Sequence, residues 1–137
     1  MTLAPAEAAK ILTDNFAPWV LDLGLTVEET AELRAVLRLP WSDRLAREGG
    51  ALCGQALMAA ADTATVLAVS AARGGFVPMT TVQQSTTFQR AVLGADVLVD
   101  ARITKLGRRM AFAEIAMTAQ GADDPAARAS TVYALLG

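Results

Sequence analysis

The stretch CGQALMAAADTATVLAVSAARGG, residues 53–75, determines how the rest of the chain is interpreted. Good helix formers run from Gln55 to Ala72 and nearly every position is apolar, so the pattern predicts a helix that is buried on most of its sides. One acid, Asp62, interrupts this run. Because an isolated carboxylate is costly to bury, Asp62 needs a hydrogen-bonding partner, access to water or a chemical role.

The segment 51–72 is also long enough to span a membrane. Alanine dominates over leucine and isoleucine in it, and Asp62 lies near its centre, where a charged residue costs roughly 2.5 to 3.5 kcal/mol on insertion scales. We therefore expect the core helix of a protein with no membrane partner.

The composition argues against several classes of function. The 137 residues fit one domain, residues 1–137, with a single core. Twelve lysines and arginines against fourteen acids give a net charge of -2, and no basic block is present, so nucleic acid is not an expected partner. There is no histidine and only one cysteine, Cys53, so neither a metal site nor an intrachain disulfide is expected. The lone cysteine and the acidic N-terminal segment favour a cytoplasmic location.

The elements on either side of the central helix are predicted from periodicity. Residues 4–24 are expected to form a helix that is interrupted within residues 15–18. Residues 31–39 alternate apolar and polar side chains, which predicts one half-buried strand. Four more strands are predicted within residues 78–90, 96–107, 109–121 and 126–137. In the first of these four, strict alternation would place Thr81 and Thr86 on opposite faces.

These elements indicate an α+β fold in which a curved antiparallel sheet of about five strands wraps around the long central helix, with an additional N-terminal helix. Strands that follow one another through short turns pair antiparallel, which argues against a doubly wound parallel sheet. One small sheet can cover only part of a helix that is apolar on nearly all sides. The chain is therefore expected to associate with itself as a dimer or a tetramer, with a two-fold dimer as the simplest case.

Three segments in this order resemble the hotdog fold, and their motifs resemble the PaaI-like acyl-CoA thioesterases of the 4-hydroxybenzoyl-CoA thioesterase superfamily. The first is EGGALCGQALMAAADTA, in which Gly54 precedes Asp62 by eight residues. The second is TTVQQSTTFQRAVLGADVLVDARI, a threonine-rich strand that leads through Phe88 into a short turn. The third is ITKLGRRMAFAEIAM, a turn that enters the next strand. The resemblance covers roughly residues 30–137, most of the chain.

Two positions depart from the family pattern. Many members carry a His-Gly-Gly triplet where this chain has Cys53, Gly54 and Gln55. Relatives often carry a hydroxyl residue one helical turn after the acid, where this chain has Val66.

The resemblance implies hydrolysis of an aryl-CoA or of a short- or medium-chain acyl-CoA at a dimer interface. Asp62 would be the general base or the nucleophile and Gly54 the donor to the oxyanion. Gln55, next to Gly54, could orient the thioester or the water as a third catalytic residue. Free N–H groups at a helix start suit the role of Gly54. Coenzyme A would be part of the substrate, with no separate cofactor. The residues expected to bind substrate are Thr65, Thr86, Thr87, Phe88, Lys105, Gly107, Arg108 and Arg109.

The residues themselves leave alternatives open. Asp62 could be a structural anchor that accepts a hydrogen bond from the backbone or from a threonine of a facing strand. Gly54 could simply begin the helix, Gln55 could cap it, and the cations near Gly107 could be a solvated hairpin end. The missing histidine and Val66 motivate a second functional hypothesis, a noncatalytic acyl-CoA or lipid-binding protein. A dehydratase would need a histidine base, and the chain has none.

Overall fold

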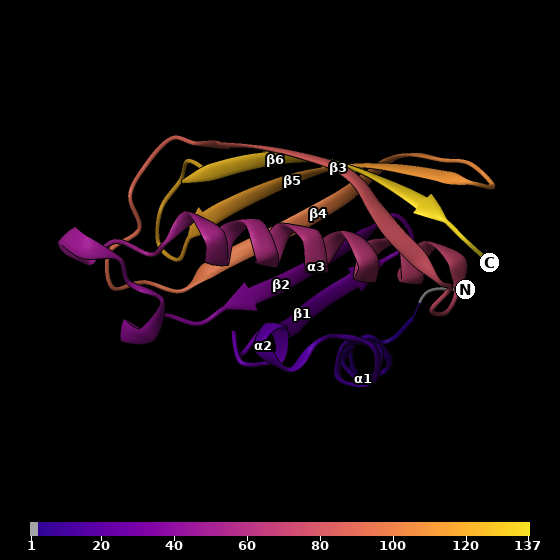
Figure 1. Ribbon diagram of the computed structural model, residues 1–137, viewed down its shortest axis with the longest axis horizontal. Helices are drawn as coiled ribbons and strands as arrows, with labels where there is room; N and C mark the ends of the chain where they lie inside the picture. Colours follow the sequence, from indigo (N-terminus) through magenta and orange to yellow (C-terminus); the bar gives the residue numbers. More distant parts are fainter. Residues whose placement is uncertain (1–2) are drawn as a thin grey trace.

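A single antiparallel sheet curls around one long helix in the computed structural model, which describes residues 3–137 (Figure 1). The six strands follow the order β1-β2-β4-β5-β6-β3, and all neighbours are antiparallel. This confirms the predicted α+β architecture. The elements are α1 (Pro5–Asn15), α2 (Pro18–Leu21), β1 (Thr26–Ala31), β2 (Arg34–Leu39), α3 (Gly54–Arg73), β3 (Met79–Phe88), β4 (Val97–Leu106), β5 (Met110–Ala119) and β6 (Ala127–Leu135), with short 3-10 turns at Asp43–Leu45 and Glu48–Gly50.

The N-terminal helical segment is interrupted where the sequence predicted. α1 ends at Asn15, and α2 begins at Pro18, a residue that favours the first helical position because it has no N–H to satisfy. The buried side of α1, which includes Ala8 and Leu12, faces the core, and α1 contacts β1 and α3. This segment therefore covers the margin of the sheet that β1 forms.

The segment before α3 differs from the prediction of one strand, because β1 and β2 form a hairpin. Ala31 pairs with Arg34, so Glu32 and Leu33 make a two-residue turn. Such turns usually contain glycine, asparagine or aspartate, and this one contains none of them. The alternation of apolar and polar side chains in residues 31–39 therefore continues through the turn, and no residue of the turn indicates where the chain reverses. As a result the sheet has six strands where about five were expected, and Leu33 is exposed at the turn.

The central helix α3 runs along the concave face of the sheet and contacts all six strands (Figure 1). Its end is set by Gly74, which adopts a φ of 77°, a left-handed conformation that glycine takes without strain. Alanines line the side of α3 that the fold covers, among them Ala60, Ala61 and Ala64, which have no exposed surface. Although α3 has the length and composition of a membrane span, 72% of its most apolar window is buried inside the fold, as expected for a core helix.

One strip of α3 is left uncovered, and we call it the open stripe: Gln55, Met58, Ala59 and Asp62. These positions recur at three- and four-residue intervals and so lie on one face of the helix. Met58 is 40% exposed, an unusual value for methionine in the middle of a core helix. The edge strand β3 runs beside the stripe, where the Gln84 side chain donates a hydrogen bond to the Met58 carbonyl oxygen (3.3 Å).

A bulge in β3 corrects the predicted alternation of that strand. Thr81 pairs with Tyr133, but Gln83 pairs with the next residue of β6, Val132, so one residue of β3 has no partner. The bulge shifts the alternation by one residue. Thr81 and Thr86 consequently face α3 together, where a regular strand would have placed them on opposite faces.

Candidate functional site

The Asp62 carboxylate lies on the open stripe and is half-buried. Its Oδ1 atom accepts two hydrogen bonds, one from the Tyr133 hydroxyl (2.6 Å) and one from the Thr81 hydroxyl (2.8 Å). Among residues 3–137, no side chain or backbone group donates a hydrogen bond to Oδ2. One carboxylate oxygen is therefore fixed by the fold, and the other is available to a ligand or to water.

Tyr133 comes from β6 and is almost fully buried, with 3% of its surface exposed. Burial, and next the negative charge of Asp62, raise the pKa of Tyr133 above its ordinary value. The phenol therefore stays protonated at neutral pH and acts as a hydrogen-bond donor. It also lies 3.1 Å from the backbone oxygen of Asp62, which ties β6 to the middle of α3.

Gly54 is the first residue of α3 and follows the N-cap residue Cys53. The first N–H groups of a helix have no partner within it, and the helix dipole adds partial positive charge there. The Phe88 ring packs against Gly54, because a Cβ atom placed on Gly54 would lie only 3.2 Å from the ring. A hollow of about 370 Å³ adjoins Gly54, lined mainly by Leu52, Leu57, Phe88 and Val92, with Arg47 and Arg90 also in its wall.

Gly54 and Asp62 are too far apart within one chain to act on the same atom. They are separated by eight residues of continuous α3, which places them about 12 Å apart along the helix axis. A carboxylate and an oxyanion donor that share one carbonyl group must both lie within about 3 Å of it. The two predicted catalytic groups can therefore meet only if a second copy of the chain supplies one of them.

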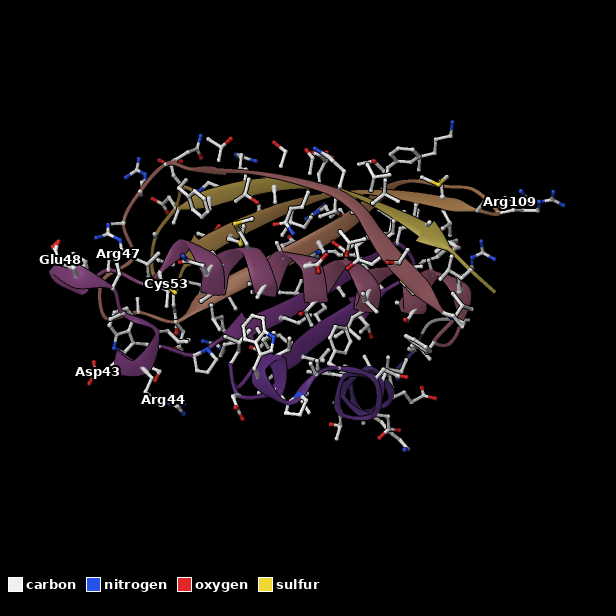
Figure 2. The ribbon with its side chains drawn as sticks, viewed as in Figure 1. Asp43, Arg44, Arg47, Glu48, Cys53 and Arg109 are labelled. Atoms are coloured by element: carbon white, nitrogen blue, oxygen red, sulfur yellow. The ribbon has the colours of Figure 1, made fainter. Side chains whose placement is uncertain are left out.

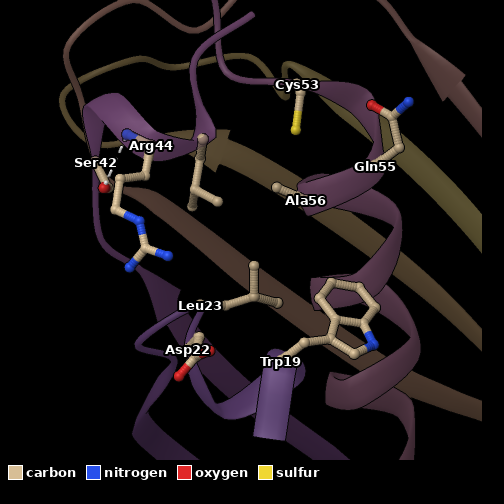
Figure 3. Close-up of a pocket in the computed structure, with 9 residues that line it drawn as sticks. Trp19, Asp22, Leu23, Ser42, Arg44, Cys53, Gln55 and Ala56 are labelled. Atoms are coloured by element: carbon tan, nitrogen blue, oxygen red, sulfur yellow. Dashed lines mark hydrogen bonds between the residues drawn. The ribbon is translucent and has the colours of Figure 1, made fainter. Parts of the chain in front are cut away.

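Gln55 lies at the N-terminal end of the open stripe, and it also borders a pocket that Asp62 does not line. It lies at the rim of a pocket of about 230 Å³ between α2, the 3-10 turn at Asp43–Leu45 and the start of α3 (Figure 3). The same pocket is lined by Trp19, Arg44 and Cys53. Gln55 and the free cysteine Cys53 therefore border the same pocket, two helical turns before Asp62.

The predicted substrate-binding residues of α3 and β3 are placed unequally. Thr65 has no exposed surface, and its hydroxyl bonds to that of Thr131 (2.9 Å), so it belongs to the core between helix and sheet. Thr86 and Phe88 face α3, and Thr86 donates to Gln84 (2.8 Å). Thr87 alternates with them and points to the other face of the sheet.

The predicted cationic turn joins β4 to β5 and lies at the end of the molecule opposite Arg47 and Cys53 (Figure 2). The turn is closed by a hydrogen bond from the Gly107 N–H to the Met110 oxygen (2.8 Å). Arg108 and Arg109 line an open groove of about 670 Å³. Lys105 is exposed at the end of β4 and is not part of the groove lining.

Sequence reasoning missed three residues at these places. Arg73, at the C-terminal end of α3, lines the groove of Arg108 and Arg109 and donates to the Gly107 carbonyl oxygen (2.8 Å). Thr81 and Tyr133 hold Asp62. Thr81 lies in the threonine-rich strand, but it faces Asp62 only because of the β3 bulge. No local pattern shows that the Tyr133 hydroxyl reaches Asp62, which is 71 positions away in the sequence.

Comparison with known proteins places this geometry in a family context. The sequence matches the family model of the Thioesterase superfamily over residues 49–126, which is more than half of the chain and includes both Gly54 and Asp62. No curated protein matches the sequence.

Many solved structures are similar in fold. Zebrafish thioesterase superfamily member 2 has a TM-score of 0.86 at 23% identity, with 98% of this chain and 100% of that chain covered. The PaaI protein of Escherichia coli has a TM-score of 0.84 at 16% identity, with 96% and 92% covered. A hypothetical thioesterase from Streptococcus pneumoniae, solved with coenzyme A, has a TM-score of 0.75 at 17% identity, with 82% and 86% covered. These likenesses confirm the predicted hotdog fold.

Proposed function

Because the chain belongs to the Thioesterase superfamily, as its motifs predicted, we propose that it hydrolyses the thioester bond of an acyl-CoA, with Asp62 as the reacting carboxylate. The observation that carries this proposal is the hydrogen bonding of the two Asp62 carboxylate oxygens. Its Oδ1 atom is held by two hydroxyl groups, while Oδ2 has no protein donor among residues 3–137 and is not buried. A half-buried carboxylate with one free oxygen can accept a proton from water or attack a carbonyl carbon.

The active site would lie between two subunits. A two-fold axis near Met58, the midpoint between Gly54 and Asp62, would set two α3 helices antiparallel and bring Gly54 of one subunit beside Asp62 of the other. The open stripe supplies the uncovered helix face that such packing needs. β3 supplies a sheet edge with unpaired backbone groups, which can pair with another β3. Each dimer would then contain two equivalent sites.

The chemistry needs only groups that the chain contains. In one route, Asp62 removes a proton from water as the oxygen of that water adds to the thioester carbonyl. In the other route, Oδ2 adds directly, and water then hydrolyses the resulting anhydride. In both routes the backbone N–H at Gly54 stabilises the negative charge on the carbonyl oxygen, and the carbon–sulfur bond breaks to release coenzyme A, whose sulfur takes up a proton. Coenzyme A enters as part of the substrate, and no separate cofactor is required.

The acyl group is proposed to occupy the hollow that adjoins Gly54. Its walls are mainly apolar, and its volume of about 370 Å³ suits an aryl group or a short- to medium-length chain. Phe88 lies directly against Gly54 and would contact the part of the acyl group nearest the thioester.

The phosphates of coenzyme A are proposed to bind at the groove formed by Arg73, Arg108 and Arg109. Guanidinium groups match phosphate geometry well. Arg73 lies eleven residues after Asp62, about 16 Å along α3, which leaves room for an extended pantetheine arm. The fold neighbour that was solved with coenzyme A supports this ligand class. The cytoplasmic location expected from the sequence stays a prediction.

The second candidate is a noncatalytic acyl-CoA-binding or lipid-binding protein. It is favoured by Cys53, which stands where many members have histidine, and by the two bonds at Oδ1, which a purely structural anchor would also make. The test is release of coenzyme A from a panel of aryl- and acyl-CoA esters by the unsubstituted protein and by Asp62→Asn. Asparagine keeps the Oδ1 acceptor, so this variant should retain its fold.

We expect turnover by the unsubstituted protein and a loss of at least roughly 100-fold in Asp62→Asn. Asp123→Asn, in the exposed β5–β6 loop, is the matched control and should leave turnover unchanged. Binding of the esters without turnover would favour the binding protein. Turnover that survives Asp62→Asn would make Asp62 a structural anchor.

A further inference from the structure

We propose that Tyr133 and Thr81 are positioning residues that select which oxygen of Asp62 reacts. By donating to the same atom, Oδ1, they fix the carboxylate plane and leave Oδ2 as the oxygen that meets the thioester or its attacking water. This inference rests on the proposed function, because it assigns roles around the same carboxylate.

The two donors reach Asp62 from neighbouring strands. Thr81 of β3 and Tyr133 of β6 are direct partners in the antiparallel register, so their side chains leave the sheet side by side toward α3. Their hydroxyl oxygens lie 2.8 Å and 2.6 Å from Oδ1, and the shorter Tyr133 distance is in the range typical of a hydrogen bond to a charged acceptor. Two donors on separate strands restrain the carboxylate more firmly than either one could alone.

Of the two donors, Tyr133 is the one that core packing holds still. Tyr133 is buried among core side chains and has only two side-chain torsions, so its hydroxyl position is fixed by packing. Its raised pKa, caused by burial and then by the charge of Asp62, keeps the donated proton in place at neutral pH. A carboxylate held in this way does not have to be oriented again in each catalytic cycle.

The β3 bulge allows one strand to serve both proposed catalytic groups. Thr81 lies before the bulge and contacts Asp62, whereas Phe88 lies after it and contacts Gly54. These residues are seven positions apart, so in a regular strand they would point to opposite faces. The bulge brings both toward α3, and such bulges often re-aim side chains next to active sites.

A purely structural role for Asp62 is a weaker explanation, because an uncharged hydrogen bond already links β6 to α3. Two residues before Tyr133 on β6, Thr131 bonds to Thr65 of α3 through their hydroxyls (2.9 Å), and both residues are buried. That pair joins the same strand to the same helix without a charge. A half-buried carboxylate is not needed to connect β6 with α3, so its presence points to chemistry.

The test compares four variants of the full-length protein: Tyr133→Phe, Thr81→Val, Thr81→Ser and Thr131→Val. The last is the matched control, because it removes a buried hydroxyl bond between β6 and α3 that does not touch Asp62. For each variant, kcat and KM are measured with the preferred CoA ester, beside the unfolding midpoint and the oligomeric state.

Positioning predicts that Tyr133→Phe and Thr81→Val lower kcat on the order of 10-fold to 100-fold with little change in KM. Thr81→Ser, which restores the hydroxyl, and Thr131→Val should keep the kcat of the unsubstituted protein. In the Asp62→Asn background, Tyr133→Phe should cause no further loss of kcat, because the two residues act as one unit.

The inference is overturned if Tyr133→Phe and Thr81→Val keep full kcat while Asp62→Asn abolishes turnover. It is also overturned if Thr131→Val lowers kcat as much as Tyr133→Phe does. Loss of any hydrogen bond between β6 and α3 would then be sufficient to lower kcat, whether or not that bond involves Asp62. Should Tyr133→Phe fail to fold, the exposed Thr81 still decides the matter through its valine and serine variants. Absence of turnover in the unsubstituted protein would remove the proposed function together with this inference.

Discussion

Replacing Met58 with glutamate should break up the proposed dimer and abolish the proposed turnover together. Met58 lies on the open stripe, midway between Gly54 and Asp62. If Gly54 of one subunit meets Asp62 of the other, the two-fold axis passes near Met58, and the two copies of this side chain pack against each other. A charge at this position would therefore disturb the centre of the interface.

The structure sets the size of the effect. Full burial of a methionine side chain contributes about 1.5 to 3 kcal/mol. Met58 is 40% exposed in the single chain, so its two copies would contribute about 1 to 2 kcal/mol on association. Two glutamates that replace them at a separation of about 6 Å would repel each other by about 3 kcal/mol at an effective dielectric constant of 20. A total near 4 kcal/mol raises the dimer dissociation constant about 1,000-fold.

The assay is sedimentation velocity over a range of protein concentrations, with kcat/KM measured on the same samples. Leu33→Glu is the matched control, because Leu33 is similarly exposed, at 47%, but lies in the β1–β2 turn and is not part of the open stripe. We expect Met58→Glu to sediment as a folded monomer without turnover and Leu33→Glu to behave as the unsubstituted protein. An associated and active Met58→Glu variant would refute the placement of the two-fold axis. A monomeric variant with full activity would refute the shared site.

Three further outcomes follow from the described contacts. Hydrogen bonding from the Trp41 backbone, and next from the Arg38 side chain, lowers the pKa of Asp96. The ionised Asp96 carboxylate therefore stabilises the fold above its ordinary pKa near 4, and this stabilisation is lost as the pH falls through the lower pKa of the folded state. The loss of unfolding free energy caused by Asp96→Asn, measured in urea, should therefore become smaller between pH 6 and pH 3. Arg108→Ala should raise KM for CoA esters about 10-fold, seen in steady-state kinetics. Gly74→Ala should cost roughly 1 to 2 kcal/mol of unfolding free energy in urea titrations, because alanine is strained at a φ of 77°.

The prediction for Arg108→Ala has two controls, a substrate without phosphates and a second arginine variant, Arg90→Ala. A thioester of N-acetylcysteamine lacks the phosphates, so its KM should not respond to Arg108→Ala. Arg47 and Arg90 line the hollow beside Gly54, at the end of the molecule opposite the Arg109 groove. If Arg90→Ala raises KM for CoA esters and Arg108→Ala does not, coenzyme A lies in the opposite orientation, with its phosphates near Gly54.

The sequence was most informative where local chemistry decides structure. The helix now seen at Gly54–Arg73 followed from its helix formers and from the glycines after it, and the break after Asn15 followed from Pro18. The β1–β2 turn was missed because Glu32 and Leu33 carry no turn signal and the apolar alternation continues through them. Periodicity records which side chains face the core, but it does not show where a strand reverses when the turn residues are ordinary.

The environment of Asp62 depends on contacts that no local pattern records. A threonine of a facing strand was considered as a partner for this acid, and Thr81 is that residue. Its identity could not be derived, because the β3 bulge changes which threonines face α3. Tyr133 is separated from Asp62 by 71 positions, so its role follows only from the register between β3 and β6. Such long-range pairings are set by the packing of the whole sheet.

The absence of histidine concentrates the proposed proton chemistry on one group. The open stripe contains a single ionisable residue, Asp62. The two hydroxyls that contact it, from Thr81 and Tyr133, already donate their protons, and the raised pKa of Tyr133 keeps that phenol protonated. Neither hydroxyl can therefore accept a proton from water. Among the groups of the open stripe and the two hydroxyls bound to it, the Asp62 carboxylate is therefore the one able to serve as the proposed proton acceptor or nucleophile, and its Oδ2 atom is the oxygen without a protein donor among residues 3–137.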